Sequence, residues 1–299
     1  MRIVSLLPSA TEIIARLGLA GDLVGRSNEC TFPPEVLDRP IVTAARIDPT
    51  DLESVEIDRL VRASIADGRS LYAVDAALMD ALRPDVIVTQ DLCAVCAVSS
   101  GELGSACPVG AEVISLDPST LEDVAASIET LAERLGVGER GRDVAAEMRA
   151  TIASVRQATR GLPRPRVFVA EWIDPPFVPG HWLPEMIEAA GGEGILGEPG
   201  RPSHPTTWDA VGAAGPELLV IAPCGFGAEE AARRSAGAVF GRDGFARIVA
   251  VDGDGYYSRP GPRLADGVRQ LGHLLHPDVV ADPGLPLIEL EPASMPSRA

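Results

Sequence analysis

The sequence predicts an α/β protein of two Rossmann-like lobes, each built on a mostly parallel sheet, joined by a long spine helix and with a ligand cleft between the lobes. Short β-prone runs alternate with segments of helical period, which is typical of a parallel sheet covered by helices. The alternation occurs twice, and a stretch of helical period almost free of proline separates the two sets. We therefore expect an N-terminal lobe at 1–118, a helical connector at 119–160, a C-terminal lobe at 161–280 and a Pro-rich tail at 281–299.

The first lobe opens on a strand-turn-helix unit. Pro8 ends the β-prone run Arg2–Leu6, and Ser9 with Glu12 three residues later fits a capping box at the start of a helix. Helical period follows at 51–66 and at 75–82, where Pro84 ends it. The other strands expected here are Asp22–Gly25, Asp85–Thr89 and Glu112–Leu116.

The connector is interrupted only near 136–138, and its second part, 139–160, is long enough to form a spine helix of about 30 Å. The second lobe contains the β-prone runs Arg166–Trp172, Glu217–Ala222 and Arg247–Val251. Helices are expected near 183–190, 206–213, 226–236 and 262–275. The tail carries four prolines and loses all period after about Leu290.

Composition restricts the class of partner. The formal net charge is −17, and the 26 basic residues are all arginine. A nucleic-acid partner needs a basic face, so we expect a small-molecule ligand and no nucleic acid. No apolar run reaches the roughly 18–20 residues of a membrane span, so no membrane insertion is expected, and we expect a monomer. Because the first strand begins within two residues of Met1, the sequence leaves no room for a secretory leader and predicts a cytoplasmic protein.

Candidate ligand-binding residues follow the carboxyl ends of the expected strands, because that edge of an open α/β sheet forms the binding crevice. The segment 171–182 is the richest, with two tryptophans, a phenylalanine and a histidine in a Pro-stiffened loop. These rings favour a platform for a flat, bulky ligand, although a hydrophobic plug beneath a long loop would have the same composition. The candidates are Pro8, Ser9, Ala10, Thr11, Glu29, Gln90, Asp91, Trp172, Asp174, Phe177, His181, Trp182, Tyr257 and Arg259.

Two cysteines, Cys93 and Cys96, form a C-x-x-C pair just beyond one strand. One such pair is half of a tetrahedral metal site, which Cys30 and His181 could complete. A redox pair and two buried structural thiols are the alternatives. The odd total of five cysteines argues against a disulfide framework.

The chain resembles the helical-backbone class of substrate-binding proteins of ABC importers, and within it the cobalamin-binding branch. The resemblance is carried by the segments at 3–12, 17–18, 23–25, 30–35, 83–87, 188–192 and 259–263, and it covers about residues 1 to 280. Two features depart from that pattern. From the position of the first strand we expect neither a leader nor a lipobox cysteine near the start, and the region 51–84 is enlarged.

The resemblance implies a binding protein, not an enzyme, with cobalamin or another tetrapyrrole or metal chelate as its ligand. Combined with the missing leader, it predicts a cytosolic binding protein in which the aromatic loop contacts the ligand and His181 is a candidate axial ligand to its metal. An exported importer component with an ABC permease as partner is the first alternative. A metal- or thiol-dependent enzyme using the cysteines is the second.

Overall fold

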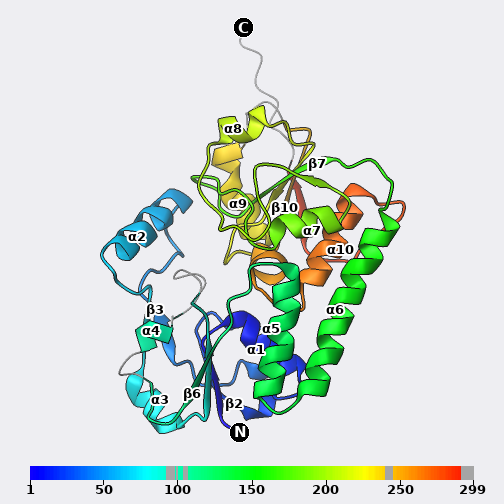
Figure 1. Cartoon of the computed structure of the whole chain (residues 1–299). Coiled ribbons are helices and arrows are strands. Elements are labelled where there is room, and N and C mark those ends of the chain that lie inside the picture. Colours follow the sequence, from blue (N-terminus) through cyan, green and yellow to red (C-terminus); the bar gives the residue numbers. More distant parts are fainter. Residues whose placement is uncertain (92–97, 99, 104–106, 240–244, 291–299) are drawn as a thin grey trace. The chain divides into compact units, whose positions relative to one another are not determined.

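The computed structural model describes residues 1–91, 98, 100–103, 107–239 and 245–290 (Figure 1). The chain divides into two compact units. Unit 1 comprises Met1–Pro118 and Glu122–Ala146, and unit 2 comprises Ser119–Leu121 and Glu147–Ala299. Both are α/β units, as the alternation of strand and helix signals predicts.

The sheet of unit 1 has the strand order β2-β1-β5-β6, and all its neighbours are parallel. These strands are β1 (Ile3–Ser5), β2 (Leu23–Arg26), β5 (Val86–Thr89) and β6 (Glu112–Ser115). Val4, Leu6, Ile87 and Met79 lie in one buried cluster of this unit. The continuous apolar character of β1 and β5 therefore reflects burial on both faces, as expected in a parallel sheet.

Helices follow the strands of unit 1 in the predicted rhythm. They are α1 (Pro8–Arg16), α3 (Ala76–Leu82), α4 (Ser100–Leu103) and α5 (Leu121–Arg134), with 3-10 turns at Ala20–Asp22 and Pro34–Val36. Arg83 ends α3 with a left-handed φ of 44°, directly before Pro84. A proline disfavours the helical conformation of the residue before it, so the helix ends where the sequence predicts.

The enlarged region 51–84 contributes one strand to an antiparallel ribbon that the sequence did not reveal. The ribbon pairs β3 (Thr43–Ala45) with β4 (Tyr72–Val74), and α2 (Ser54–Ala66) lies between these strands in the sequence. A capping box formed by Glu53 and Glu56 begins α2. The predicted helix at 51–66 is thus present, within an excursion from the main sheet.

The region of the expected connector contains α5 and the longer helix α6 (Gly138–Ala158). Gly136, which has a φ of 76°, lies between the two helices. The division between the units falls within α6, after Ala146. No helix in the described part of the chain is both long and apolar enough to cross a membrane.

Unit 2 has a five-stranded sheet of order β11-β10-β9-β7-β8. Its strands are β7 (Arg166–Ala170), β8 (Glu193–Gly194), β9 (Leu218–Ile221), β10 (Arg247–Val251) and β11 (Leu287–Leu290). All pairs are parallel except that of β10 with β11. The segment predicted as a tail thus contains an edge strand, because Leu287–Leu290 pairs with residues 248–251 of β10.

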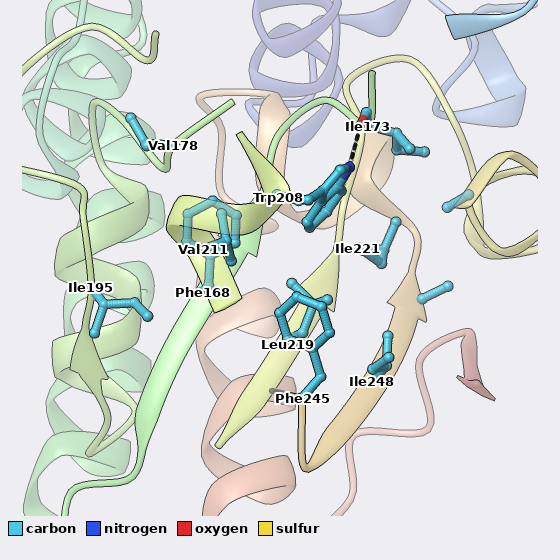
Figure 2. Packing of buried hydrophobic residues seen from close by; sticks show 13 residues of the cluster. Phe168, Ile173, Val178, Ile195, Trp208, Val211, Leu219, Ile221, Phe245 and Ile248 are labelled. Atoms are coloured by element: carbon cyan, nitrogen blue, oxygen red, sulfur yellow. Dashed lines mark hydrogen bonds between the residues drawn. The ribbon is translucent and has the colours of Figure 1, made fainter. Parts of the chain in front are cut away.

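The helices of unit 2 are α7 (Leu183–Ala189), α8 (Trp208–Ala213), α9 (Ala228–Val239) and α10 (Leu264–Leu275), with a π-helical turn at Asp254–Ser258. Figure 2 shows the buried cluster beneath α8, where Phe168 of β7 and Leu219 of β9 lie near Phe245. The indole N–H of Trp208 donates to the carbonyl of Ile173 across 3.0 Å. This bond attaches the loop after β7 to the core.

Candidate ligand-binding site

The carboxyl edge of the unit 1 sheet collects the predicted residues of that unit. Because β1, β2 and β5 are parallel, the segments that follow them meet at one edge of the sheet. These segments carry Pro8 to Thr11, Glu29, Gln90 and Asp91. Sequence and topology therefore agree that these side chains belong to a common edge.

Helix α1 begins at this edge, but not in the way the sequence suggested. Leu7 is the N-cap, Pro8 occupies the first turn, and no side chain caps the helix. The predicted Ser9–Glu12 capping box is therefore wrong. Proline is pre-organised for the first helical position, so the helix starts two residues earlier than a Ser9 cap would place it, and Ser9 lies inside its first turn.

A buried thiol lies behind the same edge. The Thr11 hydroxyl donates to the Sγ of Cys30 at 3.0 Å, and that Sγ lies 3.8 Å from the carbonyl oxygen of Ser5. Thr11 and Cys30 are both fully buried. Cys30 is thus engaged in local packing of unit 1, as a structural cysteine would be.

The loop after β2 carries a polar network. The Thr43 hydroxyl donates to the side-chain oxygen of Asn28 at 2.7 Å, and the Asn28 amide donates to the Glu29 carboxylate at 2.6 Å. Beyond β5, Gln90 is buried, and the backbone N–H of Asp91 donates to the Asp117 carboxylate at 2.5 Å. This edge is therefore lined by fixed polar groups.

The predicted metal site has no support in the described part of the chain. Within those residues, no three His, Cys, Asp or Glu side chains come together as metal ligands. Cys93 and Cys96 lie outside the described residues. Their role therefore stays a prediction.

In unit 2, backbone N–H groups hold the aromatic loop after β7 in place through hydrogen bonds to the Glu171 side chain and to the segment at His204. The Gly180 N–H donates to the Glu171 carboxylate at 2.5 Å, and Val178 N–H donates to the His204 carbonyl at 3.0 Å. Asp174 is exposed and Phe177 is half-buried. The loop is thus a fixed structure that presents polar and aromatic groups at the carboxyl end of β7.

Trp172 forms part of a ring stack. Its ring lies 5.8 Å from that of Phe226, between centroids, and the Arg234 guanidinium lies 4.3 Å above the Phe226 ring. Glu230 pairs with Arg234 at 2.6 Å. Hydrogen bonds, first from Arg233 and then from Arg234, lower the pKa of Glu230 to about 2. The cation over the Phe226 ring is therefore held in place on α9.

Strand-end reasoning places the segment 224–226 at this edge, but Phe226 is not among the candidate residues named from the sequence. Its position after β9 brings it to the edge reached by Trp172 after β7, because the two strands are parallel neighbours. The Cys224 N–H donates to the Glu171 carbonyl at 3.1 Å, which ties the two loops together. The signal available in the sequence was a phenylalanine just beyond a predicted strand end.

Two predicted ligand contacts are interior residues instead. Trp182 is 6% exposed, and its indole N–H donates to the carbonyl of Tyr257 at 2.7 Å. Tyr257 is fully buried and donates its hydroxyl to Gln270 at 2.8 Å. Burial, with Asp252 nearby, raises the pKa of Tyr257. We therefore correct the assignment of Trp182 and Tyr257 from ligand contacts to packing residues of unit 2. The sequence shows that both are aromatic, but it does not show that their polar atoms bond inside the unit.

His181 has an unusual backbone. Its φ is +49°, and the conformation is held by a 2.6 Å bond from its own N–H to the Arg201 carbonyl and a 2.9 Å bond from Gly200 to its carbonyl. Burial lowers the pKa of the imidazole, which is half-buried. Strained positions of this kind occur often at ligand sites, which supports the prediction for this residue.

Arg259 follows the π-helical turn after β10 and is 7% exposed. Its guanidinium pairs with Asp254 through contacts of 2.5 and 3.1 Å. π-Helical turns are frequent at functional sites, because the extra residue redirects the following side chains.

Comparison with known proteins identifies the family that this chain matches. The model of the periplasmic binding protein family matches residues 3–254. A vitamin B12-binding protein of Vibrio cholerae is 24% identical, with 90% of this chain and 87% of that protein covered. An ABC transporter substrate-binding lipoprotein of Bacillus subtilis is 22% identical, with 93% and 80% covered.

Solved structures agree on the fold. The periplasmic vitamin B12-binding protein of Vibrio cholerae matches with a TM-score of 0.63 and 22% identity, over 92% of this chain and 96% of that one. A periplasmic heme-binding protein of Pseudomonas aeruginosa matches with a TM-score of 0.66 and 19% identity, over 97% and 95%.

These relatives overturn one prediction. The names of the Vibrio and Pseudomonas proteins call them periplasmic and that of the Bacillus protein calls it a lipoprotein, so the cytoplasmic location inferred from the start of the chain is wrong. The inference failed because a start close to the first strand is not evidence about cellular location. The members of the family are binding proteins, which agrees with the prediction that the chain is not an enzyme. With its two α/β units and a match over most of its length, the chain belongs to the periplasmic binding protein family.

Proposed function

We propose that this protein is the substrate-binding component of an ABC importer and that its substrate is cobalamin or another tetrapyrrole. The observation that carries the proposal is the ring pair of Trp172 and Phe226 at the carboxyl edge of the unit 2 sheet. Both rings are half-buried, so each keeps an exposed portion. Relatives whose names say that they bind vitamin B12 or heme support the same ligand class.

Aromatic rings suit this class of ligand. A ring presents a large apolar surface with only two rotatable bonds, so it orders on binding at low entropic cost. Arg234 fixes Phe226 from behind by a cation–π contact. The stack is thus pre-organised, which favours affinity for a flat macrocycle.

His181 is the proposed ligand to the metal of the bound macrocycle. Burial lowers its pKa, so the imidazole is neutral near pH 7, and the neutral form is the one that coordinates a metal ion. In the described part of the chain, no hydrogen bond occupies its ring nitrogens. Asp174 and Phe177 are proposed contacts from the same loop.

Unit 1 contributes the edge that follows β1, β2 and β5 in this proposal. The proposed contacts there are Pro8, Ser9, Ala10, Thr11, Glu29, Gln90 and Asp91. Arg259, which is paired with Asp254, is proposed to position the turn after β10. An ABC permease is the proposed protein partner.

The test is a titration of the purified protein with hemin and with hydroxocobalamin, followed by absorbance and calorimetry. We expect micromolar or tighter binding of at least one, with a shift of its main absorption band. Replacing Phe226 or Trp172 with alanine should weaken binding about thirtyfold, the effect of about 2 kcal/mol at a buried contact ring. Val279→Ala, which removes an exposed apolar side chain of unit 2, is the matched control. If neither compound binds, the ligand class is wrong.

A further inference from the structure

Helix α1 begins with donors that lack acceptors. The N–H of Thr11 donates to the Leu7 carbonyl at 3.1 Å. Within the described chain, the N–H groups of Ser9 and Ala10 have no acceptor, and no side chain caps the helix. Both residues are buried, at 1% and 0% exposure. Unpaired N–H groups at a buried helix start are rare, because each costs free energy.

A side chain provides a third unpaired donor at the same place. The hydroxyl of Ser9 is buried and has no hydrogen-bond partner. Side chains of a helix lean toward its N-terminus, so this hydroxyl is directed to the end where the free N–H groups lie. Three donors therefore meet at the first turn of α1, and none of them has an acceptor among the described residues.

The helix dipole at the start of α1 favours an anion. No acidic residue lies in the first turn of α1, whose dipole places partial positive charge at this end. On the neighbouring strand, Arg26 is paired in register with Ser5, the last residue of β1. Its guanidinium is 7% exposed and donates to the carbonyls of Ser27, Cys30 and Leu37.

Arg26 carries a charge that is not paired with a carboxylate in the described part of unit 1. Within the described residues no carboxylate contacts it, and its Nε is buried without a partner. Carbonyl oxygens satisfy its N–H groups, but they do not cancel its charge. The protein as a whole is acidic, yet exposed charges are screened by salt over about 8–10 Å, whereas buried ones are screened much less.

We propose that the first turn of α1 binds an oxyanion on the periphery of the ligand, through Ser9 and the N–H groups of Ser9 and Ala10. This inference rests on the proposed function and narrows it to tetrapyrroles that carry a negative charge. Two sources have this chemistry, the carboxylates of a porphyrin and the phosphodiester of a complete corrinoid. A neutral amide would accept the same hydrogen bonds without gaining from the charge.

The experiment compares ligands with and without the anion. Hemin is paired with hemin dimethyl ester, and cyanocobalamin with dicyanocobinamide, which lacks the phosphodiester together with the ribose and base attached to it. Each is titrated into the wild-type protein, Ser9→Ala and the control Ser127→Ala, in one detergent-containing buffer. Ser127 is a suitable control because its hydroxyl donates to its own helix, at the Val124 carbonyl.

We expect the wild-type protein and the control to prefer the anionic member of one pair at least tenfold, and Ser9→Ala to reduce that preference at least threefold. A preference that Ser9→Ala reduces identifies a carboxylate when it occurs in the hemin pair and the phosphodiester when it occurs in the corrinoid pair. Equal binding of both members in each pair that binds, or an unchanged preference in Ser9→Ala, would overturn the inference while leaving the proposed function intact. Binding of none of the four compounds would overturn both.

Discussion

Replacing Tyr257 with phenylalanine should destabilise unit 2 without changing ligand affinity. The hydroxyl of this fully buried residue donates to Gln270 Oε1 at 2.8 Å, and the Gln270 amide donates in turn to the Pro286 carbonyl at 3.1 Å. The substitution removes one oxygen atom and keeps the ring. It therefore isolates the hydrogen bond from the packing.

The magnitude follows from the acceptor that is left behind. Gln270 is 4% exposed, so its carbonyl oxygen cannot turn to bulk solvent when the tyrosine hydroxyl is gone. An unsatisfied buried polar group costs about 1–3 kcal/mol. For a unit of this size, about 2 kcal/mol corresponds to a fall in Tm of roughly 4–8 °C.

A double-mutant cycle assigns the effect to this pair. We expect the losses in unfolding free energy for Tyr257→Phe and Gln270→Leu to sum to more than the loss for the double variant. The reason is that removing both partners leaves neither of them unsatisfied. The assay is urea unfolding of the three variants and the wild type, followed by circular dichroism. Additive losses would refute the argument that the two groups depend on each other.

Ligand titration completes this test. Because Tyr257 is interior, Tyr257→Phe should keep the affinity for the tetrapyrrole within twofold of wild type. A tenfold weakening, with stability unchanged, would show instead that the hydroxyl contacts the ligand.

Three further predictions follow from the same contacts. Trp208→Phe should lower the free energy of unfolding by about 2–3 kcal/mol, because it removes the bond to Ile173 and part of a buried ring; a change in urea midpoint too small to measure would contradict this. Arg234→Leu should weaken tetrapyrrole binding severalfold with a smaller effect on Tm, since it removes the cation behind Phe226; calorimetry beside thermal unfolding separates the two effects. Burial lowers the pKa of His181 below 6.5, so its contribution to stability is complete above about pH 6.5 and is lost as the pH falls through the lowered pKa. The Tm of ligand-free His181→Gln should therefore depend less on pH than the Tm of wild type between about pH 7.5 and 5. Parallel curves of Tm against pH would contradict this.

The candidate site shows how far strand-end reasoning reaches. Parallel strands end at a common edge, so the segments after β1, β2 and β5 could be placed together before any coordinates were known. The same rule brought Trp172 and the segment holding Phe226 to one edge. It could not separate a ring that is half-exposed, as in Trp172, from one turned inward and bonded, as in Trp182.

The sequence by itself determined the α/β class, the two-unit organisation and the long helix of the connector, because these depend on local periodicity and on breakers such as Pro84 and Gly136. Only the tertiary structure decided which of the candidate side chains are free to meet a ligand. Tyr257 and Cys30 have their polar atoms occupied by residues distant in sequence, whereas the hydroxyl of Ser9 remains without a partner. The physical reason is that hydrogen-bond satisfaction and burial depend on long-range neighbours, which periodicity along the chain does not record.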